Sequence, residues 1–287
     1  MEVTAVVVTY NRLELLKENI EALRNQTVSN FKILIVNNHS TDGTKEYVEK
    51  LPYENLCIMT LPENLGGAGG FYYGIKKAYE DGAEAVWIMD DDTMPQPDAL
   101  ENLLHGAKKL KADYGFLASD VRWIDNSPCI MNKVHRIKGK QEAYDRIDTA
   151  TFVSLLIPRE TIAQVGLPLK EYFIWGDDKE YTLRISDRLP CYFIPSSKVV
   201  HKMKVNMGSN VVTDEPQRIQ RYFYAYRNDY ATAKKRGRKY LLVYYAGFCL
   251  NALRILLYSK QEKKDRLNVM KRGLKAGRDF SPVEERI

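Results

Sequence analysis

Three consecutive aspartates, Asp90, Asp91 and Asp92, follow an apolar run that ends at Met89. Neighbouring carboxylates repel one another, so three of them at the end of a strand need a positive partner. Carboxylates at this spacing suit a hard divalent cation, Mg²⁺ or Mn²⁺, which also binds phosphate oxygens. An acidic turn that begins the following helix is the simpler explanation, but two acids would suffice for it. We therefore predict a metal site here.

A second acidic group, Asp177, Asp178 and Glu180, follows Trp175 and begins a predicted helix. A carboxylate at a helix start, near a diphosphate held by a metal ion, is suitably placed to act as a general base. The simpler explanation is that the acids complement the positive end of the helix dipole. That explanation suits Asp177 alone better than it suits both aspartates.

Two polar segments could contact a nucleotide or a sugar. In "PENLGGAGGFYYG", Asn64, Gly66 and Gly67 precede a helix, and glycines there let backbone N–H groups approach a phosphate. The segment is neither a P-loop nor a GxGxxG motif, and a helix-entry turn that needs positive φ would explain it equally. In "VNNHSTDGT", Asn38 follows a strand and could read a base edge, while residues 40–44 are expected to form a capped helix start.

The elements that must position these residues alternate along the first third of the chain. Strands are expected at 3–10, 31–38, 55–61 and 83–90, and helices at 11–26, 40–51, 69–82 and 97–110. This alternation predicts βαβ units, that is, an α/β fold with a mostly parallel sheet covered on both faces. Ligands of such sheets bind beyond the carboxyl ends of the strands, where the polar clusters lie.

The rest of the chain is less regular up to about residue 200 and then becomes helical. We expect a strand entering a short helix at 149–160, a helix that opens at Gly176–Asp177, and a strand, a turn and a second strand across 191–204. Helices are expected at 217–239 and 240–260. We divide the chain into a domain at 1–215, with a nucleotide-binding half (1–110) and an acceptor half (111–215), and a basic helical region at 216–287.

The basic helical region contains 15 Lys and Arg against 5 Asp and Glu over residues 231–287. Such asymmetry indicates an anionic surface as partner, and phospholipid is preferred to nucleic acid. The stretch 240–260 is apolar and rich in tyrosine, but Asn251 and Arg254 interrupt it, so we expect it to lie at a bilayer surface rather than to span the membrane. Packing on the catalytic domain or on the partner of a homo-oligomer fits the pattern equally well.

The composition is that of an ordinary globular protein, with 45% hydrophobic and 28% charged residues. The four cysteines are scattered singly, which argues against a zinc site or a disulfide framework and fits a reducing cytoplasm. The first residues are typical of a strand and not of a signal peptide. We expect a cytoplasmic protein, peripheral on the inner face of the cell membrane.

Five segments in order resemble the motifs of inverting family 2 glycosyltransferases of the GT-A fold. They are "VVVTYNR", "ILIVNNHSTDGT", "NLGGAGGFYYGI", "VWIMDDDTMPQPDAL" and "FIWGDDKEYTLRI", followed by "VVHK", and they cover residues 3 to about 202. The "NLGGAGGF" and "DDDT…WGDD" segments most resemble the galactofuranosyl- and rhamnosyltransferase branch that builds bacterial surface glycans. The resemblance implies a Rossmann-like, mostly parallel sheet flanked by helices, with a helical C-terminal extension.

The resemblance also implies roles for individual residues on the donor side. Asn38 would contact the base, although many relatives have Asp there. Asp90 would lie towards the ribose and the metal, Asp92 would ligate the metal, and Asp91 would share the role of Asp92. The nucleotide-sugar pocket would be formed by Thr9, Tyr10, Arg12, Asn38, Asn64, Gly66, Gly67, Asp90 and Asp91.

The metal, Mn²⁺ or Mg²⁺, would be held by Asp90, Asp92 and His201. A lone histidine is more often structural, so His201 is a candidate ligand only through the resemblance. On the acceptor side, Asp178 would be the general base, and Trp175 with Asp177 would contact the acceptor sugar.

The implied reaction moves one sugar by direct displacement onto a lipid-linked or growing surface glycan. Galactofuranose from UDP-galactofuranose is the expected donor, and rhamnose from dTDP-rhamnose is the alternative. The QxxRW motif and the membrane spans of processive synthases are absent, which favours the addition of one or a few sugars. A nucleotidyltransferase would normally carry a glycine-rich, basic signature that "VVVTYNRLELL" lacks, and a non-catalytic sugar-nucleotide binder would not need the candidate base.

Overall fold

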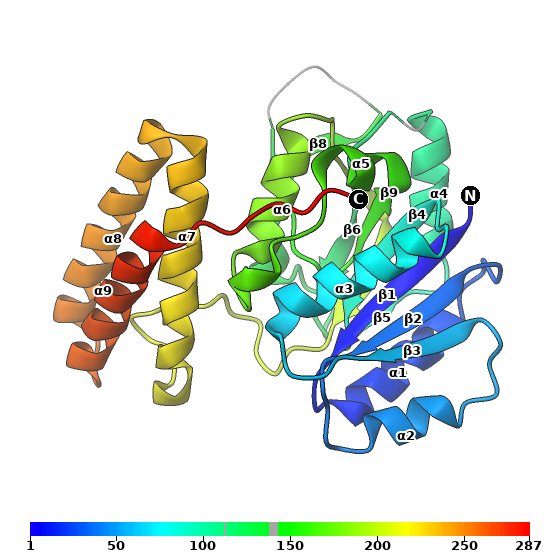
Figure 1. The fold of residues 1–287 in the computed structure, drawn as a ribbon, viewed down its shortest axis with the longest axis horizontal. Coiled ribbons are helices and arrows are strands. Elements are labelled where there is room, and N and C mark those ends of the chain that lie inside the picture. Colours follow the sequence, from blue (N-terminus) through cyan, green and yellow to red (C-terminus); the bar gives the residue numbers. More distant parts are fainter. Residues whose placement is uncertain (112, 138–142) are drawn as a thin grey trace. The chain divides into compact units, whose positions relative to one another are not determined.

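The computed structural model describes residues 1–111, 113–137 and 143–287, which form two compact units (Figure 1). The first unit comprises Met1–Lys170, Asp178–Met207 and Glu284–Ile287. The second unit comprises Glu171–Asp177 and Gly208–Val283. The sequence-based division instead placed its boundary after residue 215.

The first unit is built on a mixed sheet whose strands lie in the order β3-β2-β1-β4-β9-β6-β10-β8-β7, with β5 paired to β10. Strands β1 to β4 are mutually parallel, β6 and β10 run the same way, and β5, β7, β8 and β9 add antiparallel pairs. The strands are β1 (Val3–Thr9), β2 (Lys32–Asn37), β3 (Leu56–Thr60), β4 (Ala85–Asp90), β5 (Thr93–Pro95), β6 (Leu117–Arg122), β7 (His135–Arg136), β8 (Asp145–Thr149), β9 (Leu155–Pro158) and β10 (Tyr192–His201). The predicted α/β fold with a mostly parallel sheet is confirmed.

Helices cover both faces of this sheet. They are α1 (Leu13–Arg24), α2 (Thr44–Glu49), α3 (Gly66–Glu80), α4 (Ala99–Lys109), α5 (Arg159–Val165) and α6 (Asp177–Ser186), with the 3₁₀ turns η1 (Ile130–Asn132) and η2 (Lys170–Tyr172). Successive strand residues point to opposite faces. In β1, Val6 and Val8 therefore join the core under α3, α5 and α6, whereas Ala5 and Val7 join the core under α1 and α4.

Two local expectations differ from the structure. The helix expected from about Ser40 begins at Thr44, because Gly43 enters it with φ +84°. The strand, turn and strand expected across 191–204 are one strand, β10, which accommodates an irregularity between Ile194 and Lys198. A strand can absorb extra residues as a bulge without turning back.

Two glycines of α3 let this helix approach the sheet closely. A Cβ at Gly70 would lie 2.4 Å from Cγ1 of Val8, and a Cβ at Gly74 would lie 2.4 Å from Cγ1 of Val6. Part of the glycine-rich segment therefore serves helix–sheet packing. A Cβ at Gly67, on the same helix, would meet nothing within 4 Å.

The second unit is helical, with η3 (Pro216–Arg221), α7 (Tyr222–Arg236), α8 (Arg238–Tyr258) and α9 (Lys263–Asp279). Its core includes Tyr226, Ile255 and Met270, one from each long helix. Gly273 and Gly277 of α9 face the backbone of α7, where a Cβ would lie 2.7 Å and 3.0 Å from carbonyl oxygens. The predicted helical C-terminal region is confirmed.

The last residues of the chain return to the first unit. The N–H of Leu167 donates to the carbonyl of Glu285 at 2.9 Å. The carboxylate of Glu285 accepts a hydrogen bond from Nζ of Lys76 at 2.6 Å and another from the hydroxyl of Tyr72. Glu284–Ile287 is thus fixed to α3 and to the end of α5 (the red end of the ribbon in Figure 1).

We predict that Gly74→Ala destabilises the first unit, because the new methyl group would meet Val6 and Val36 in a packed core. Overpacking of this kind costs about 1–3 kcal/mol. The matched variant Gly67→Ala should be neutral or stabilising, by up to about 1 kcal/mol, because it adds a helix-forming residue in open space. Urea denaturation of the ligand-free proteins measures both, and equal stability of the two variants would contradict the close-packing explanation.

Candidate active site

The candidate site lies where β1 and β4 end side by side. Strand β2 lies on one side of β1 and β4 on the other, so the strand order reverses here. The N–H of Asp91 donates to the carbonyl of Val8 at 3.2 Å, and Oγ1 of Thr9 donates to Oδ2 of Asp91 at 2.8 Å. Open α/β sheets bind ligands at such a reversal, beyond the carboxyl ends of the strands.

Arg12 is a positive partner of the aspartate cluster. It follows β1, and its Nη1 lies 2.7 Å from Oδ2 of Asp92 and 3.3 Å from Oδ1 of Asp91. Both aspartates are buried, whereas the side chain of Arg12 is half exposed. The guanidinium therefore bridges two buried carboxylates at the edge of the crevice and still reaches solvent.

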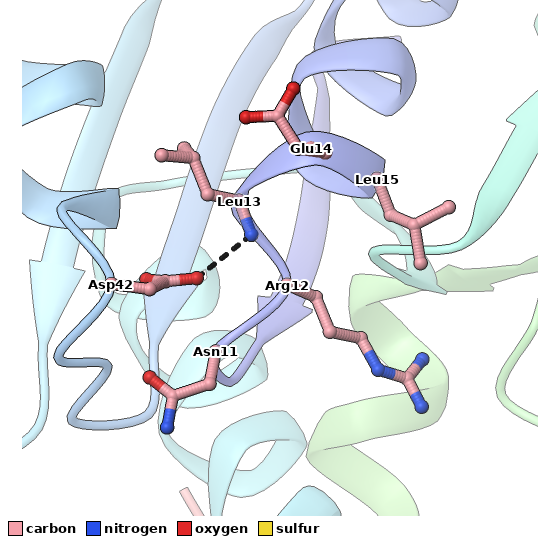
Figure 2. A pocket seen from close by; sticks show the side chains of 6 residues that line it. All are labelled: Asn11, Arg12, Leu13, Glu14, Leu15 and Asp42. Carbon is pink, nitrogen blue, oxygen red and sulfur yellow. Dashed lines mark hydrogen bonds between the residues drawn. The ribbon is translucent and has the colours of Figure 1, made fainter.

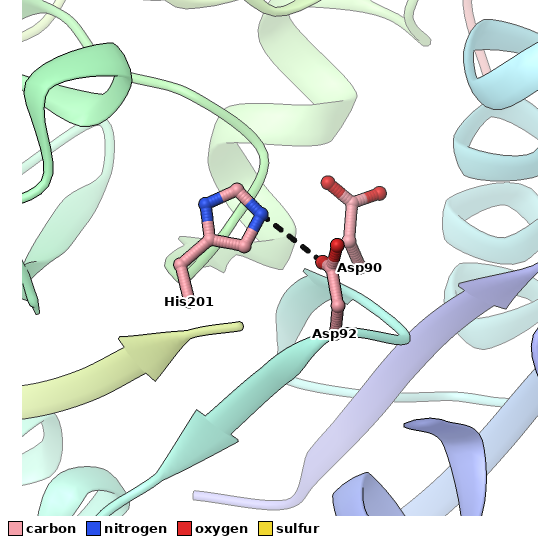
Figure 3. A group of neighbouring side chains, drawn as sticks. All are labelled: Asp90, Asp92 and His201. Carbon is pink, nitrogen blue, oxygen red and sulfur yellow. Dashed lines mark ion pairs between the residues drawn. The ribbon is translucent and has the colours of Figure 1, made fainter. Parts of the chain in front are cut away.

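His201 is the second positive partner, brought in by pairing between β5 and β10. The two strands are antiparallel, with His201 opposite Thr93, and the N–H of Lys202 donates to the carbonyl of Asp92 at 2.8 Å. Nε2 of His201 lies 3.0 Å from Oδ1 of Asp92 (Figure 3). Ligand atoms of Asp90, Asp92 and His201 all lie within 4.8 Å of one another.

Asn132 orients the imidazole of His201. Its Oδ1 lies 2.8 Å from Nδ1 of His201, which turns Nε2 towards the carboxylates. The amide of Asn132 is held in turn, because Nδ2 donates to Oγ1 of Thr151 at 2.6 Å and Oδ1 accepts from Sγ of Cys129 at 2.8 Å. Sequence reasoning missed Asn132, since nothing in its local segment indicates a partner on β10.

Burial and mutual repulsion perturb the protonation of the cluster. Burial, and then the charge of Asp92, raise the pKa of Asp90 well above its usual value, and burial raises the pKa of Asp91 to about 6. Burial also opposes ionisation of Asp92 and His201, but their contact outweighs it. The contact between the two side chains, with help from Arg12, lowers the pKa of Asp92. The same contact raises the pKa of His201 to about 10.

The residues of this cluster fit a divalent cation. Oδ1 of Asp92 is buried and accepts no hydrogen bond of acceptable geometry within the described part of the chain, although Nε2 of His201 is near. Oδ1 of Asp92 therefore depends on its ion pair with His201, and a divalent cation between these two groups would be a second way to satisfy it. Two carboxylates and an imidazole are donors that Mn²⁺ accepts.

The loop before α3 is tied to the end of β2 by Asn38. The buried amide of Asn38 donates to Oδ1 of Asn64 at 3.0 Å and to the carbonyl of Gly66 at 2.9 Å, and its Oδ1 accepts from the N–H of Leu65 at 2.9 Å. Asn38 therefore uses its side chain to shape the glycine loop. Its contact with a base stays a prediction.

An open hollow of about 460 Å³ lies at the start of α1 (Figure 2). It is lined by Asn11, Arg12, Leu13, Glu14, Leu15 and Asp42. Oδ2 of Asp42 accepts from the N–H of Leu13 at 2.9 Å, so this carboxylate caps α1. Arg12 turns its guanidinium away from Asp42, and Tyr10 is exposed.

Asp178 lies in the first turn of α6. The following contacts link this turn to the side chain of His201. Oγ1 of Thr182 donates to the carbonyl of Asp178 at 2.7 Å and accepts from the N–H of Ala150 at 3.4 Å. The next residue, Thr151, accepts from the amide that orients His201. Glu180 serves the fold instead, since it pairs with Arg184 through contacts of 3.0 and 2.9 Å.

Trp175 and Asp177 belong to the second unit. The ring of Trp175 contacts Tyr222 edge-on, with centroids 5.0 Å apart, and the guanidinium of Arg218 lies 5.9 Å from its centroid. The loop that carries Trp175 has unusual backbone angles, with φ of +63° at Phe173 and +65° at Trp175. Such angles persist only where the surroundings enforce them.

Asn228 of α7 enforces this loop geometry. It is fully buried, and its Nδ2 donates to the carbonyls of Tyr172, Ile174 and Trp175 at 2.9, 3.2 and 2.7 Å. Its Oδ1 accepts from Nε of Arg227 at 2.9 Å. Sequence reasoning missed Asn228, because an asparagine inside a helix carries no signal of the loop that it binds.

Comparison with known proteins decides the family. The sequence profile of Glycosyl transferase family 2 matches residues 4–161, more than half of the chain. The chain belongs to this family. This glycosyltransferase is also 25% identical to galactofuranosyltransferase GlfT1 of Mycolicibacterium smegmatis over 84% of its own length and 85% of the relative's.

Solved structures of other glycosyltransferases share the fold. The mannosyltransferase PcManGT of Pyrobaculum calidifontis, in complex with GDP-Man and Mn²⁺, aligns with a TM-score of 0.59 and 18% identity over 98% of this chain and 76% of its own. GalNAc-T7 with UDP, GalNAc and Mn²⁺ aligns with a TM-score of 0.62 and 14% identity over 80% of this chain. The present glycosyltransferase spans half the length of that second structure.

The glycosyltransferase thus gathers some of its predicted site residues and not others. Thr9, Arg12, Asp91, Asp92 and His201 form one connected series of contacts, in which Thr9 meets Asp91, Arg12 meets Asp91 and Asp92, and Asp92 meets His201. A second group, Asn38 with Asn64 and Gly66, forms the neighbouring loop. Trp175 and Asp177 lie in the other unit, so their roles stay predictions.

We predict that Asn228→Ala loosens the Trp175 loop of this glycosyltransferase, because three carbonyls lose their donor. A buried polar group left without its partner costs about 1–3 kcal/mol. Hydrogen exchange of residues 173–176, followed by mass spectrometry, should speed up, and the second unit should unfold at lower urea. Asn268→Ala on the exposed side of α9 is the control and should change neither; unchanged exchange in Asn228→Ala would contradict the clamp.

Proposed function

We propose that this family 2 glycosyltransferase transfers galactofuranose from UDP-galactofuranose to a glycan acceptor, with inversion at the anomeric carbon. The observation that carries the proposal is the grouping of Asp90, Asp92 and His201 at the carboxyl end of β4. The similarity to a galactofuranosyltransferase along most of both chains favours this donor over dTDP-rhamnose.

The donor would bind across the β1–β4 crevice and the glycine loop. Thr9 and Arg12 already contact the aspartates there, and the open backbone at Gly67 leaves room for a phosphate or a sugar. The hollow beside Arg12 has the volume of a small-molecule site. Tyr10, the residue before Asn11 in the chain, is exposed and would stack on the base.

Asp90, Asp92 and His201 would hold a Mn²⁺ or Mg²⁺ ion, which when bound offsets the charge that develops on the departing diphosphate. Asn132 keeps Nε2 of His201 turned towards that position. The half-exposed guanidinium of Arg12 adds positive charge at the edge of the site. These residues together favour separation of a dianionic leaving group from the sugar.

The acceptor hydroxyl would attack the anomeric carbon from the face opposite the diphosphate. Asp178 takes the hydroxyl proton as the new C–O bond forms and the bond from C1 to the diphosphate oxygen breaks. One displacement of this kind inverts the configuration and needs no covalent sugar–enzyme intermediate. Trp175 would present a flat face to the acceptor sugar, with Asp177 beside it as a hydrogen-bond acceptor.

We predict that Asp178→Asn lowers turnover by about 10²–10⁴-fold, the usual contribution of general base catalysis. Donor binding and folding should be retained, because Asn keeps the size of the side chain and an oxygen that can accept the N–H of Lys179, as Oδ1 of Asp178 does. Product formation and donor-induced thermal shift measure the two effects. Asp81→Asn, at the far end of α3, is the matched control, and near-normal turnover of Asp178→Asn would rule out the base assignment.

We also predict that EDTA abolishes transfer and that Mn²⁺ restores it in the native protein but not in Asp92→Asn. A donor present at about 100 times its Kd adds about 2.7 kcal/mol of stability, which a thermal shift detects. UDP-galactofuranose with Mn²⁺ should give a larger thermal shift than dTDP-rhamnose with Mn²⁺, and it should give the transfer product. A thermal shift and product formation with dTDP-rhamnose but not with UDP-galactofuranose would show that dTDP-rhamnose is the donor. Full activity in EDTA would rule out a requirement for a metal ion.

A further inference from the structure

The outer side of α8 is an apolar surface that the second unit leaves uncovered. The helix is 21 residues long; its most apolar 18-residue window has a mean hydropathy of 1.6, and only 6% of that window is buried. We define the α8 surface by its exposed side chains: Leu242, Val243, Leu250, Leu253, Leu256 and Leu257. These recur at helical spacing and form one stripe, with Leu242 71% and Leu257 61% exposed.

Positive charges frame the α8 surface. Arg238 and Lys239 lie at its start, Lys260, Lys263 and Lys264 follow its end, and the helix itself contains no acidic residue. Exposed tyrosines, Tyr240 and Tyr258, mark both ends. Apolar side chains between cations and tyrosines match the layers of an anionic bilayer surface, where acyl chains meet phosphates.

The same charges disfavour a second copy of the chain as the partner that covers the α8 surface. In a two-fold pair of α8 helices, each helix end faces an end of its partner. Both ends are cationic, so parallel and antiparallel arrangements would both bring like charges together. An anionic lipid surface has the opposite charge.

Length and composition alone would let α8 cross a membrane, but its inner side is committed to the other helices. The hydroxyl of Tyr244 donates to the carbonyl of Tyr226 at 3.0 Å, and Nδ2 of Asn251 donates to the hydroxyl of Tyr226 at 3.0 Å. Ile255 is fully buried in the same core. A spanning α8 would have to break these contacts or carry charged residues of α7 and α9 into hydrocarbon: Arg227, Asp229, Arg266 and Lys271.

We propose that the second unit docks on an anionic phospholipid bilayer with α8 parallel to the membrane plane and the α8 surface inserted among the lipids. This docking would hold the enzyme beside a lipid-linked acceptor, and that purpose rests on the proposed function. The binding itself does not, because vesicles without any sugar test it. Failure of the docking and failure of the transferase proposal are therefore separate results.

The first experiment is flotation of the full chain with phosphatidylcholine vesicles, with and without phosphatidylglycerol. We expect flotation with the anionic vesicles that weakens as salt increases. Leu253→Glu with Leu257→Glu should reduce the bound fraction about tenfold or more, because charge would enter the acyl region. Ile124→Glu with Val205→Glu, at first-unit positions 59% and 56% exposed, is the matched control and should float like the native protein.

The second experiment measures depth with an environment-sensitive fluorophore. Cys249 on α8 is a natural attachment point once the other exposed cysteine is removed by Cys57→Ser. For α8 in the membrane plane, probes at Cys249, Leu242→Cys and Leu257→Cys should be quenched by lipid-borne quenchers at one shallow depth, whereas Lys271→Cys on α9 stays in water. A deep Cys249 with shallow ends would show a spanning helix and overturn the proposal.

Three other results would also overturn it. They are absence of flotation, equal flotation of the leucine variant and its control, and concentration-dependent dimerisation that the leucine variant abolishes. Probes on α8 that are already shielded from water without vesicles would show that protein covers the surface. Equal melting temperatures of the two double variants establish that any loss of flotation is not a loss of folding.

Discussion

The structure depends on the compensation of three adjacent carboxylates in a crevice that buries two of them. Asp90, Asp91 and Asp92 follow β4 because the strand must end where the ligand crevice begins. Their repulsion is offset by Arg12, directly after β1, and by His201, at the end of β10. The parallel β1–β4 pair and the antiparallel β5–β10 pair are therefore both needed to assemble one group of charges.

This requirement explains why the second half of the sheet is mixed. An all-parallel continuation would bring strand ends to the crevice but would not lay β5 alongside β10. In the observed register, the residue after Asp92 lies opposite His201, so the imidazole meets the carboxylate by strand pairing. Asn132 then fixes the ring from a 3₁₀ turn on the other side. Strand register thus sets the chemistry of the site as directly as the motif does.

The sequence was informative wherever the signal is local. The alternating strands and helices of residues 3–110 follow from periodicity, and the aspartates and glycines identify themselves by type and spacing. His201 was reached only through resemblance, because its partner Asp92 lies far away in the sequence, in the turn between β4 and β5. The amides of Asn132 and Asn228 could not be foreseen, since their value comes from carbonyls and rings that the fold brings near. Asn38 was expected to contact a ligand, whereas its amide is observed to shape the glycine loop.

The anchoring of Glu284–Ile287 beside α3 has a consequence for the architecture. The chain leaves the sheet unit at Met207 and comes back to it at Glu284, but the helical unit between these points also includes the loop Glu171–Asp177. Residues 208–283 therefore could not be exchanged as a cassette on their own: the loop that Asn228 holds would have to be replaced with them, and the proposed acceptor residue Trp175 lies in that loop.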